Sequence, residues 1–519
     1  MATKIVDTQW GNGQGLTRRR WVRLLATLMV TLSAESGQAF NGLSMPGLGV
    51  NQVGMAGAGT ALLSDSAATL RNPAAGAFLQ SGSTWDLLLG LPTAGYSASA
   101  TADDSRFSLF EFRPGTYRSV YMAAAAPTLS SIRRVSDRWA WGLGLYGAGL
   151  GSTLIDGSAN IGRGIPTLSS ECQGDFAGGM ALTPTSGSSQ CGLGTENAGI
   201  QATQVISSAY LSFRPWSWMA VGAAPLVVTE QLRIRGLSAF APYAVEEDRV
   251  TDRGYEFSWG LGYRLGLHLR PIDELDFGMS YQPRVQMTTL ERYRGVIQGG
   301  NLDVPSNLNF GLHLKLSPNQ SVMVDLDEIH YSEVQVLRSS PDLQEFVNRC
   351  LLPRLIRLSV AGQEDSAYCL GGSQGPGFGW GDTTIFKIGY EMRADRWSWR
   401  AGYSAGGSPV RIPDAVMTTL VPAVVDKHLA VGASWAYSPR LNIGLALSYA
   451  IQGHERVRNG LSNIQLETSG VSGIVGALLG DGALLQADVG RDASDQTVDI
   501  YMDTWELQLG LSWTLPGAR

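Results

Sequence analysis

Charged residues are scarce in this sequence, and long apolar runs are missing after its amino-terminal leader. Charged side chains make up 16% of the 519 residues, whereas soluble proteins usually carry about 25%. This scarcity argues against the two to four soluble domains that the length alone suggests. No later apolar run approaches the ~20 residues that a membrane-spanning helix needs. The sequence therefore predicts neither an ordinary soluble protein nor a helical membrane protein.

Several chemical signatures are also missing. The five histidines show no metal-ligand spacing. No Gly-x-Ser-x-Gly elbow or other nucleophile constellation occurs, and Asp325 and Asp327 are interpreted as a polar row facing a lumen rather than as a catalytic pair. A net charge of −6 does not indicate the basic surface that nucleic-acid binding requires. We therefore predict no catalytic residues, no metal, no cofactor and no nucleic-acid partner.

Glycine and aromatic residues are plentiful instead, with 64 Gly, 14 Trp and 17 Tyr. Period-two alternation recurs, as in YEFSWGLGYRLGLHL (Tyr255–Leu269) and WELQLGLSWTL (Trp505–Leu515). One face is apolar and the other is small or polar, which suits a crowded lumen better than the charged surface of a soluble sandwich. We predict an all-β protein, a transmembrane antiparallel β-barrel in the outer membrane of a Gram-negative cell. A secreted all-β protein is the alternative.

Short turns alternate with long connections, which is typical of the periplasmic and extracellular ends of outer-membrane barrels. The pattern predicts a barrel over residues 83–519 with about fourteen strands. These are Ser83–Ala100, Tyr117–Pro127, Arg138–Leu150, Gln201–Phe213, Met219–Arg235, Gly254–Leu269, Leu275–Tyr293, Asn307–Leu316, Ser321–Leu337, Thr383–Met392, Trp397–Ser404, His428–Tyr437, Leu441–His454 and Trp505–Leu515. The predicted extracellular loops are Thr153–Asn197, Gly236–Arg253, Arg338–Gly381, Gly406–Val425 and Arg456–Asp503.

The amino terminus predicts export. TRRRWVR (Thr17–Arg23) is a basic region, LLATLMVTLSA (Leu24–Ala34) is a short apolar core, and GQA ends at Ala39 with a small-x-small cleavage pattern. We predict a signal peptide over residues 1–39, with Phe40 as the mature amino terminus. A buried hydrophobic helix is the alternative.

The four cysteines form two local pairs with equal spacing, Cys172 with Cys191 and Cys350 with Cys369. In an exported protein, an even number in local pairs predicts disulfides. Zinc is the rival, but neither pair has the short spacing of a zinc site. Both predicted disulfides lie in long extracellular loops.

Residues 40–82 precede the first strand and are too glycine-rich for a separate domain and too apolar for a linker. GLGVNQVGMAGAGTALLSDSAATLRNPAAGA (Gly47–Ala77) resembles the amino-terminal hatch of the FadL/TodX outer-membrane transporters, and Asn72, Pro73 and Ala74 match the end of that motif. The late segment GGSPVRIPDAV also resembles the family. The chemistry suits a plug, because Asn can bridge to the barrel wall and Pro removes a donor that would need a partner. An ordinary turn before a strand is the alternative.

The resemblance implies a third strand that kinks inward and opens the wall. Glycines permit the bulge that such a kink needs, and the candidates are Gly142, Gly144, Gly147 and Gly149. Glycines that make room for the plug are the alternative. Their GLGLYG spacing also matches a dinucleotide fingerprint, but no helix follows it.

The resemblance further implies passive uptake of a hydrophobic ligand, with long-chain fatty acids as the expected cargo, by hatch movement and lateral release into outer-membrane lipid. Arg233, Arg235 and Lys387 are candidates for the ligand carboxylate by strand position alone, and a structural role is the alternative for each. The rivals are uptake of aromatic hydrocarbons by the same route, a structural or adhesive barrel, and a barrel lipid hydrolase. We expect a monomer and no enzymatic activity.

Overall fold

The structure of this chain is a computed structural model that describes residues 45–99, 112, 114–119, 124–152, 198–340, 343–351, 353–354, 365–461, 465–467, 486–488 and 496–515. The predicted signal peptide and the predicted Cys172–Cys191 disulfide lie outside these residues. No helix in the described part is both long and apolar enough to cross a membrane.

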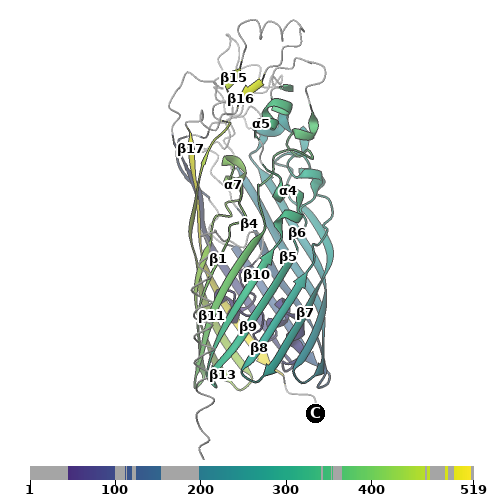
Figure 1. Cartoon of the computed structure of the whole chain (residues 1–519), viewed down its shortest axis with the longest axis vertical. Coiled ribbons are helices and arrows are strands. Elements are labelled where there is room, and N and C mark those ends of the chain that lie inside the picture. The colour runs from purple at the N-terminus through teal and green to yellow at the C-terminus, as the bar shows by residue number, and fades with distance from the viewer. Residues whose placement is uncertain are drawn as a thin grey trace, which may run out of the picture. The chain divides into compact units, whose positions relative to one another are not determined.

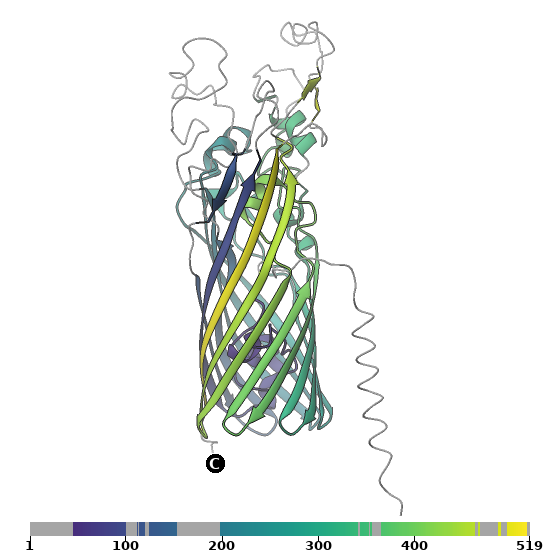
Figure 2. The ribbon, with the colours of Figure 1, turned by 90° about the vertical axis from the view of Figure 1, so that its left-hand side faces the viewer.

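Fourteen antiparallel strands form a closed barrel, as the alternation predicts (Figure 1). They are β1 (Gly82–Ala98), β3 (Ala124–Arg134), β4 (Trp139–Ser152), β5 (Gly199–Trp216), β6 (Met219–Arg235), β7 (Glu256–Ile272), β8 (Leu275–Gln282), β9 (Asn307–Ser317), β10 (Gln320–Ile329), β11 (Thr383–Ala394), β12 (Trp397–Gly406), β13 (Lys427–Ser438), β14 (Leu441–Arg458) and β17 (Thr497–Thr514). Each pairs with its neighbour along the chain, and β17 closes the barrel by pairing with β1 from Gly82↔Thr514 to Ala98↔Val498. Figure 2 shows these two strands side by side.

Shorter elements complete the described chain. They are the strands β2 (Gly115–Arg118), β15 (Gln465–Glu467) and β16 (Gln486–Asp488), and the helical turns α2 (Val50–Val53), α3 (Ala68–Arg71), η1 (Pro73–Ala77), η5 (Ser238–Tyr243), η6 (Glu247–Arg249), η7 (Glu291–Tyr293), η8 (Gln298–Gly300), η9 (Tyr331–Glu333), α4 (Gln335–Arg338), α5 (Leu343–Phe346), η10 (Val347–Leu351), η11 (Ser366–Tyr368) and α7 (Ala415–Leu420). Strand β2 pairs with the outer end of β1, on the same edge as β3.

The outward face of the barrel is apolar, as the alternation requires. On β7, Phe257 is 70% exposed and Leu261 is 65% exposed, while the intervening Ser258 is buried. Stacked tryptophans such as Trp216 and Trp218 lie at the short-turn end, where an aromatic girdle is expected. The outward side chains therefore form a surface suited to lipid.

One predicted strand, Tyr117–Pro127, is displaced, since β3 spans Ala124–Arg134. Two other predicted strands are too long. The pattern predicts a strand over Leu275–Tyr293, but β8 ends at Gln282, because Pro283 lacks the N–H that would continue the ladder. Val285 then packs onto Gly262 in the neighbouring strand, so its segment folds over the barrel wall. The predicted strand Ser321–Leu337 likewise ends at Ile329 and is followed by helical turns. In both places apolar alternation continues in a loop that is buried at the barrel mouth.

The long loops pack together at one end of the barrel around a large apolar cluster, and Figure 1 shows α4, α5 and α7 at this end. Cys350 and Cys369 form the disulfide that the spacing predicts, within the β10–β11 loop. Asp414 caps α7 by accepting hydrogen bonds from the backbone N–H groups of Val416 and Met417. Burial raises the pKa of the Asp414 carboxyl, and these backbone hydrogen bonds oppose that rise. The loop end is thus a packed cap.

Candidate functional site

Residues 45–79, here called the inner segment, lie within the lower part of the barrel (Figure 2). Its turns contact strands on opposite sides of the wall, with η1 against β5, β6 and β7 and α2 against β13, β14 and β17. Most of its side chains are buried, including Met55 and Ala58, which are fully covered. The segment that the sequence analysis assigned to a plug thus occupies the lumen.

The inner segment meets the wall mainly at glycines, one on each of ten strands. These are Gly144, Gly222, Gly266, Gly278, Gly311, Gly389, Gly402, Gly432, Gly444 and Gly510. Eight of them form directly opposed pairs, namely Gly222↔Gly266, Gly278↔Gly311, Gly389↔Gly402 and Gly444↔Gly510. A Cβ atom on Gly402 would lie 2.1 Å from the carbonyl carbon of Met55. The absence of side chains at this level therefore makes the space that the inner segment fills.

Asn72 joins the inner segment to the wall. Its side-chain oxygen accepts a hydrogen bond from the Ala74 N–H (3.1 Å), which caps η1. Its side-chain nitrogen donates to the carbonyl of Leu267 in β7 (3.0 Å) and to the carbonyl of Thr60 (3.3 Å). The Ser212 hydroxyl donates to the carbonyl of Pro73. The amide thus uses one acceptor and both donors at a site with no exposed surface.

A buried ionic cluster forms a second attachment. Arg71 of the inner segment forms an ion pair with Asp327 of β10 (2.8 Å), and Lys387 of β11 forms another with the same carboxylate oxygen (2.7 Å). Arg71 and Lys387 both donate to the carbonyl of Pro46. Asp325, two residues from Asp327, accepts from the backbone N–H groups of Gly59 and Thr60. The Asp325/Asp327 row therefore faces the lumen and anchors the inner segment.

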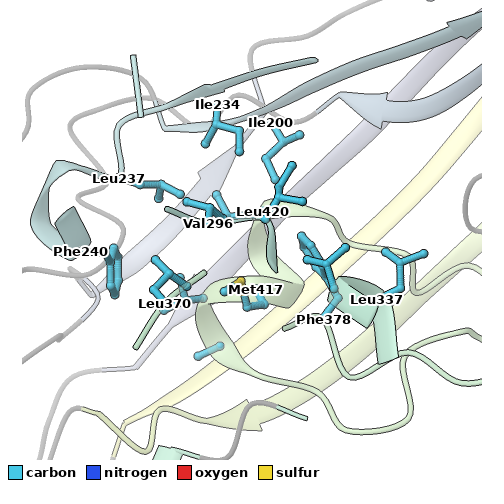
Figure 3. Close-up of a cluster of buried hydrophobic side chains, with 14 of the residues drawn as sticks. Ile200, Ile234, Leu237, Phe240, Val296, Leu337, Leu370, Phe378, Met417 and Leu420 are labelled. Atoms are coloured by element: carbon cyan, nitrogen blue, oxygen red, sulfur yellow. The ribbon is translucent and has the colours of Figure 1, made fainter. Parts of the chain in front are cut away.

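An apolar pocket, here called the outer pocket, lies among the long loops. Twelve side chains line it: Ile200, Ala202, Leu232, Ile234, Val296, Ile297, Leu302, Val336, Leu337, Phe378, Trp380 and Val421. Figure 3 shows Ile200, Ile234 and Val296 turned toward one another, with Leu420 beside them. The cavity is only about 40 Å³, which is room for a few water molecules. A larger ligand therefore requires the surrounding loops to move apart.

A second cavity of about 70 Å³, here called the inner cavity, lies directly below the outer pocket. Ala202 lines the outer pocket and Gln204, two residues along the same face of β5, lines the inner cavity. The floor of the inner cavity is the inner segment, through Met45, Leu48 and Arg71. The inner cavity thus lies next to the outer pocket along β5 and reaches down to the inner segment.

Arg264 of β7 lines the inner cavity and is 7% exposed. It donates to the Gln282 side chain (2.7 Å), to the Tyr146 hydroxyl (2.9 Å) and to the carbonyl of Leu70. Its Nε has no hydrogen-bond partner, and within the described residues no carboxylate forms an ion pair with it. A buried cation with only neutral partners is costly unless an anion reaches it. The inner cavity is therefore suited to a carboxylate.

The barrel wall has a gap in its hydrogen-bond ladder beside this cavity. Strands β3 and β4 pair from Arg134↔Ala140 to Thr128↔Tyr146, and no further rung is present among the described residues, although both strands continue. Pro127 follows the last rung and has no N–H to donate. The register of β4 against β5 also shifts after Gly149. Among the described residues, the β3–β4 ladder thus ends at Thr128↔Tyr146, below the outer ends of both strands.

The predicted kink glycines divide between two positions. Gly142 and Gly144 lie on the lumen-facing side of β4, where a Cβ atom on Gly144 would meet Leu70 at 2.0 Å. Gly147 lies beside Ala126, in the unpaired stretch, and Gly149 lies at the register shift. Gly144 therefore makes room for the inner segment, Gly142 makes room for Tyr210 of β5, and the last two belong to the gap.

The predicted carboxylate-binding residues fare differently. Arg233 and Arg235 lie on the outward face of β6, because the alternating residues Leu232 and Ile234 point into the outer pocket. They are therefore placed wrongly for a ligand inside the barrel. Lys387 does face the lumen but is held by Asp327. Arg264 lies on the lumen face that the alternation of Tyr255–Leu269 indicates, and nothing in that alternation distinguishes it from the other polar residues of this face.

The described residues contain no cluster of three or more His, Cys, Asp or Glu side chains arranged to hold a metal ion. Asp276 is the most densely surrounded carboxylate, with His268, Arg270 and Lys315 within 3.1 Å. Two cations in this group make it an ion-pair cluster at the short-turn end rather than a metal site.

Comparison with known proteins agrees with this architecture. The sequence model of a family described as outer membrane protein transport protein (OMPP1/FadL/TodX) matches residues 252–478. No curated protein matches the chain.

Several solved structures share the fold. A Pseudomonas aeruginosa FadL homologue is 14% identical, with a TM-score of 0.57 over 91% of this chain and 99% of its own. The Pseudomonas putida toluene transporter TodX is 15% identical, with a TM-score of 0.54 over 91% and 99%. The Ralstonia pickettii toluene transporter TbuX is 16% identical, with a TM-score of 0.52 over the same shares. At these identities the likeness establishes the fold.

Proposed function

Because the chain belongs to the OMPP1/FadL/TodX family of outer-membrane transport proteins, we propose that its cargo is an amphipathic carboxylate with a long apolar tail, such as a long-chain fatty acid. Uptake is passive, and the inner segment acts as the hatch. The barrel lies in the outer membrane, and its short turns face the periplasm.

The observation that carries this proposal is Arg264 below the outer pocket. Apolar burial contributes about 25 cal/mol per Å² for a tail in the outer pocket. A carboxylate that reaches the inner cavity gains charge-assisted hydrogen bonds from Arg264, which are about twice as strong as neutral ones. The apolar pocket and the cation thus match the two ends of one ligand.

Aromatic hydrocarbons are the second candidate. TodX and TbuX are toluene transporters, and the outer pocket of this chain is lined by apolar side chains that include Phe378 and Trp380. A small uncharged ring would use this pocket and gain nothing from Arg264. Proteoliposomes that carry the protein and take up labelled oleate but not toluene would support the first candidate, and the reverse result would support the second.

We propose the β3–β4 gap as the exit. Tilted strands rise about 2.5 Å per residue along the barrel axis, so the stretch from Tyr146 to Ser152 lies about 18 to 33 Å above Trp139 at the periplasmic girdle. The lower part of that range lies in the outer half of an apolar band about 25 Å tall, and the rest lies above the band. Tyr146 also contacts Arg264, so cargo held by Arg264 lies beside the gap.

A disulfide across the gap should block uptake. A Cβ atom on Gly147 would lie 3.0 Å from the Cβ of Ala126, and a separation of about 3.5–4.5 Å is needed for a disulfide, so a small outward shift lets oxidised Ala126→Cys/Gly147→Cys tie β3 to β4. We expect oleate uptake by this variant to fall about tenfold or more in proteoliposomes, while each single cysteine variant transports normally. Normal uptake by the fully cross-linked protein would place the exit elsewhere.

Asn72→Ala tests the role of the inner segment as a hatch. The change removes three hydrogen bonds and takes the side-chain acceptor away from the buried Ala74 N–H, a loss of about 1–3 kcal/mol. We expect a loosened inner segment and a rate of oleate uptake that differs from the wild type several-fold, with heat-modifiable migration confirming the barrel. Wild-type uptake by a correctly assembled variant would rule out the role assigned to Asn72.

A further inference from the structure

Arg233 and Arg235 form an outward-facing basic pair at the extracellular end of β6. Burial alternates along this strand, and the residues between them point into the barrel. Within the described residues neither guanidinium forms an ion pair, and the Nε atom of each has no hydrogen-bond partner. These two arginines are therefore not used by the transport path or by the loop cap.

The pair belongs to a polar row that crosses three strands. Arg233 lies opposite Gln201 of β5 in the sheet register. Its guanidinium stacks over the ring of Tyr255, 5.2 Å from the ring centre, and the Tyr255 hydroxyl donates to the Gln201 side chain (3.3 Å). Arg235 lies opposite Gly199, whose lack of a side chain leaves space beside it. Stacking and register hold the donors of this row in place.

The row lies just above the apolar belt of the barrel. On β7 the outward residues below Tyr255 are apolar, beginning with Phe257 (70% exposed) and Trp259 (53% exposed) and continuing to Leu269. Twelve residues separate Phe257 from Leu269, which is about 30 Å along the barrel axis and equals the thickness of a bilayer's hydrocarbon core. The arginines are thus at the level of the outer-leaflet headgroups.

The acidic groups near the row are already engaged. Asp252 accepts hydrogen bonds from the Gly236 N–H and the Thr251 hydroxyl. Asp248 lies 3.9 Å from Arg253, a third cation of this region that is about half exposed. The three arginines of this region, Arg233, Arg235 and Arg253, thus outnumber its two carboxylates, Asp248 and Asp252.

We propose that Arg233 and Arg235 bind a phosphate group of a phosphorylated glycolipid in the outer leaflet, that is, of lipopolysaccharide. Guanidinium groups match phosphate with paired hydrogen bonds, and the acyl chains of the same lipid lie against Phe257 and Trp259. This site faces away from the lumen, so it is independent of the cargo and of the proposed function.

Binding of lipid A to the purified, delipidated barrel tests this proposal. We expect Arg233→Gln/Arg235→Gln to weaken lipid A binding about tenfold or more, as measured by native mass spectrometry. Arg233→Lys/Arg235→Lys retains the charges and should recover part of the affinity. Arg133→Gln, an exposed outward change at the periplasmic end of β3, is the matched control and should bind lipid A as the wild type does.

Three results would overturn the assignment. The first is a glutamine double variant that binds lipid A as tightly as the wild type does. The second is a wild type that binds phosphatidylglycerol vesicles as tightly as lipid A, and the third is one that binds inorganic phosphate as tightly as lipid A. Oleate uptake by the glutamine variant should equal that of the wild type. Lost uptake with unchanged lipid A binding would contradict the independence of the two sites. The proposed carboxylate cargo is tested separately, by the variants of Arg264.

Discussion

Replacing Arg264 with Gln should reduce oleate uptake about ten- to a hundredfold while toluene uptake stays within twofold of the wild type. The range follows from the about 1.5–3 kcal/mol that a hydrogen bond to a charged group contributes. Gln keeps a polar amide at the level of the Arg264 Nε but loses the positive charge and the two terminal nitrogens that donate to Tyr146 and Leu70. A carboxylated cargo therefore loses its cationic partner, and an uncharged cargo loses no ionic contact.

The controls separate recognition from support of the wall. Arg264→Lys retains the charge without the paired geometry, so oleate uptake should be intermediate. Oleate binding, followed by titration calorimetry, should weaken in the same order as uptake. Equal losses for oleate and toluene would show that Arg264 supports the barrel or the inner segment, since it also donates to the Leu70 carbonyl.

Replacing Asp327 with Ala should dislodge the inner segment. The change leaves Arg71 and Lys387 as two buried cations beside the single carboxylate of Asp325, and stranding a buried charge typically destabilises by about 3–5 kcal/mol. We expect higher conductance in planar bilayers, and greater sensitivity of cells to hydrophilic antibiotics that are normally excluded. The barrel itself should still assemble, because its strand ladder is unchanged.

A double variant tests whether charge imbalance is the cause. Asp327→Ala/Lys387→Met leaves one cation, Arg71, and one carboxylate, Asp325, so the cluster is neutral again. Replacing a buried ion pair by apolar groups is often tolerated, and conductance should return most of the way to the wild-type value. If the double variant conducts as strongly as Asp327→Ala, loss of the Asp327 contacts rather than the charge imbalance opens the lumen.

The strand pattern could be predicted from the sequence because a barrel repeats one local rule. Alternation sets which residues face lipid, and short polar turns mark one end, so most of the fourteen strands lie where the pattern places them. The rule fails at Pro283 and after Ile329, where apolar residues alternate in loops buried at the barrel mouth. There the tertiary environment of the loops imitates that of a strand.

The site was only partly predictable, because local sequence patterns do not show which distant residues the fold brings together. The bridging of Asn72 follows from amide chemistry and from the matched motif. That Arg264 faces the lumen follows from the alternation of side chains along its strand. The Arg71–Asp327–Lys387 cluster joins three distant parts of the chain, so no local pattern reveals it. Arg233 and Arg235 are candidates for the ligand carboxylate by their position along the strand alone, whereas the alternation of β6 places their side chains on the outer face of the barrel.

The interrupted β3–β4 ladder also affects the bilayer around the barrel. Hydrocarbon offers no partner to an open peptide group, and each such group is unfavourable there by several kcal/mol. We therefore expect water or headgroups to reach down to the residues above Thr128 and Tyr146. This would make one hydrated stretch on an otherwise lipid-covered outer surface. Acyl chains beside this stretch should be shorter and less ordered than those elsewhere on the perimeter, and amide protons there should exchange with deuterium faster than those of β13.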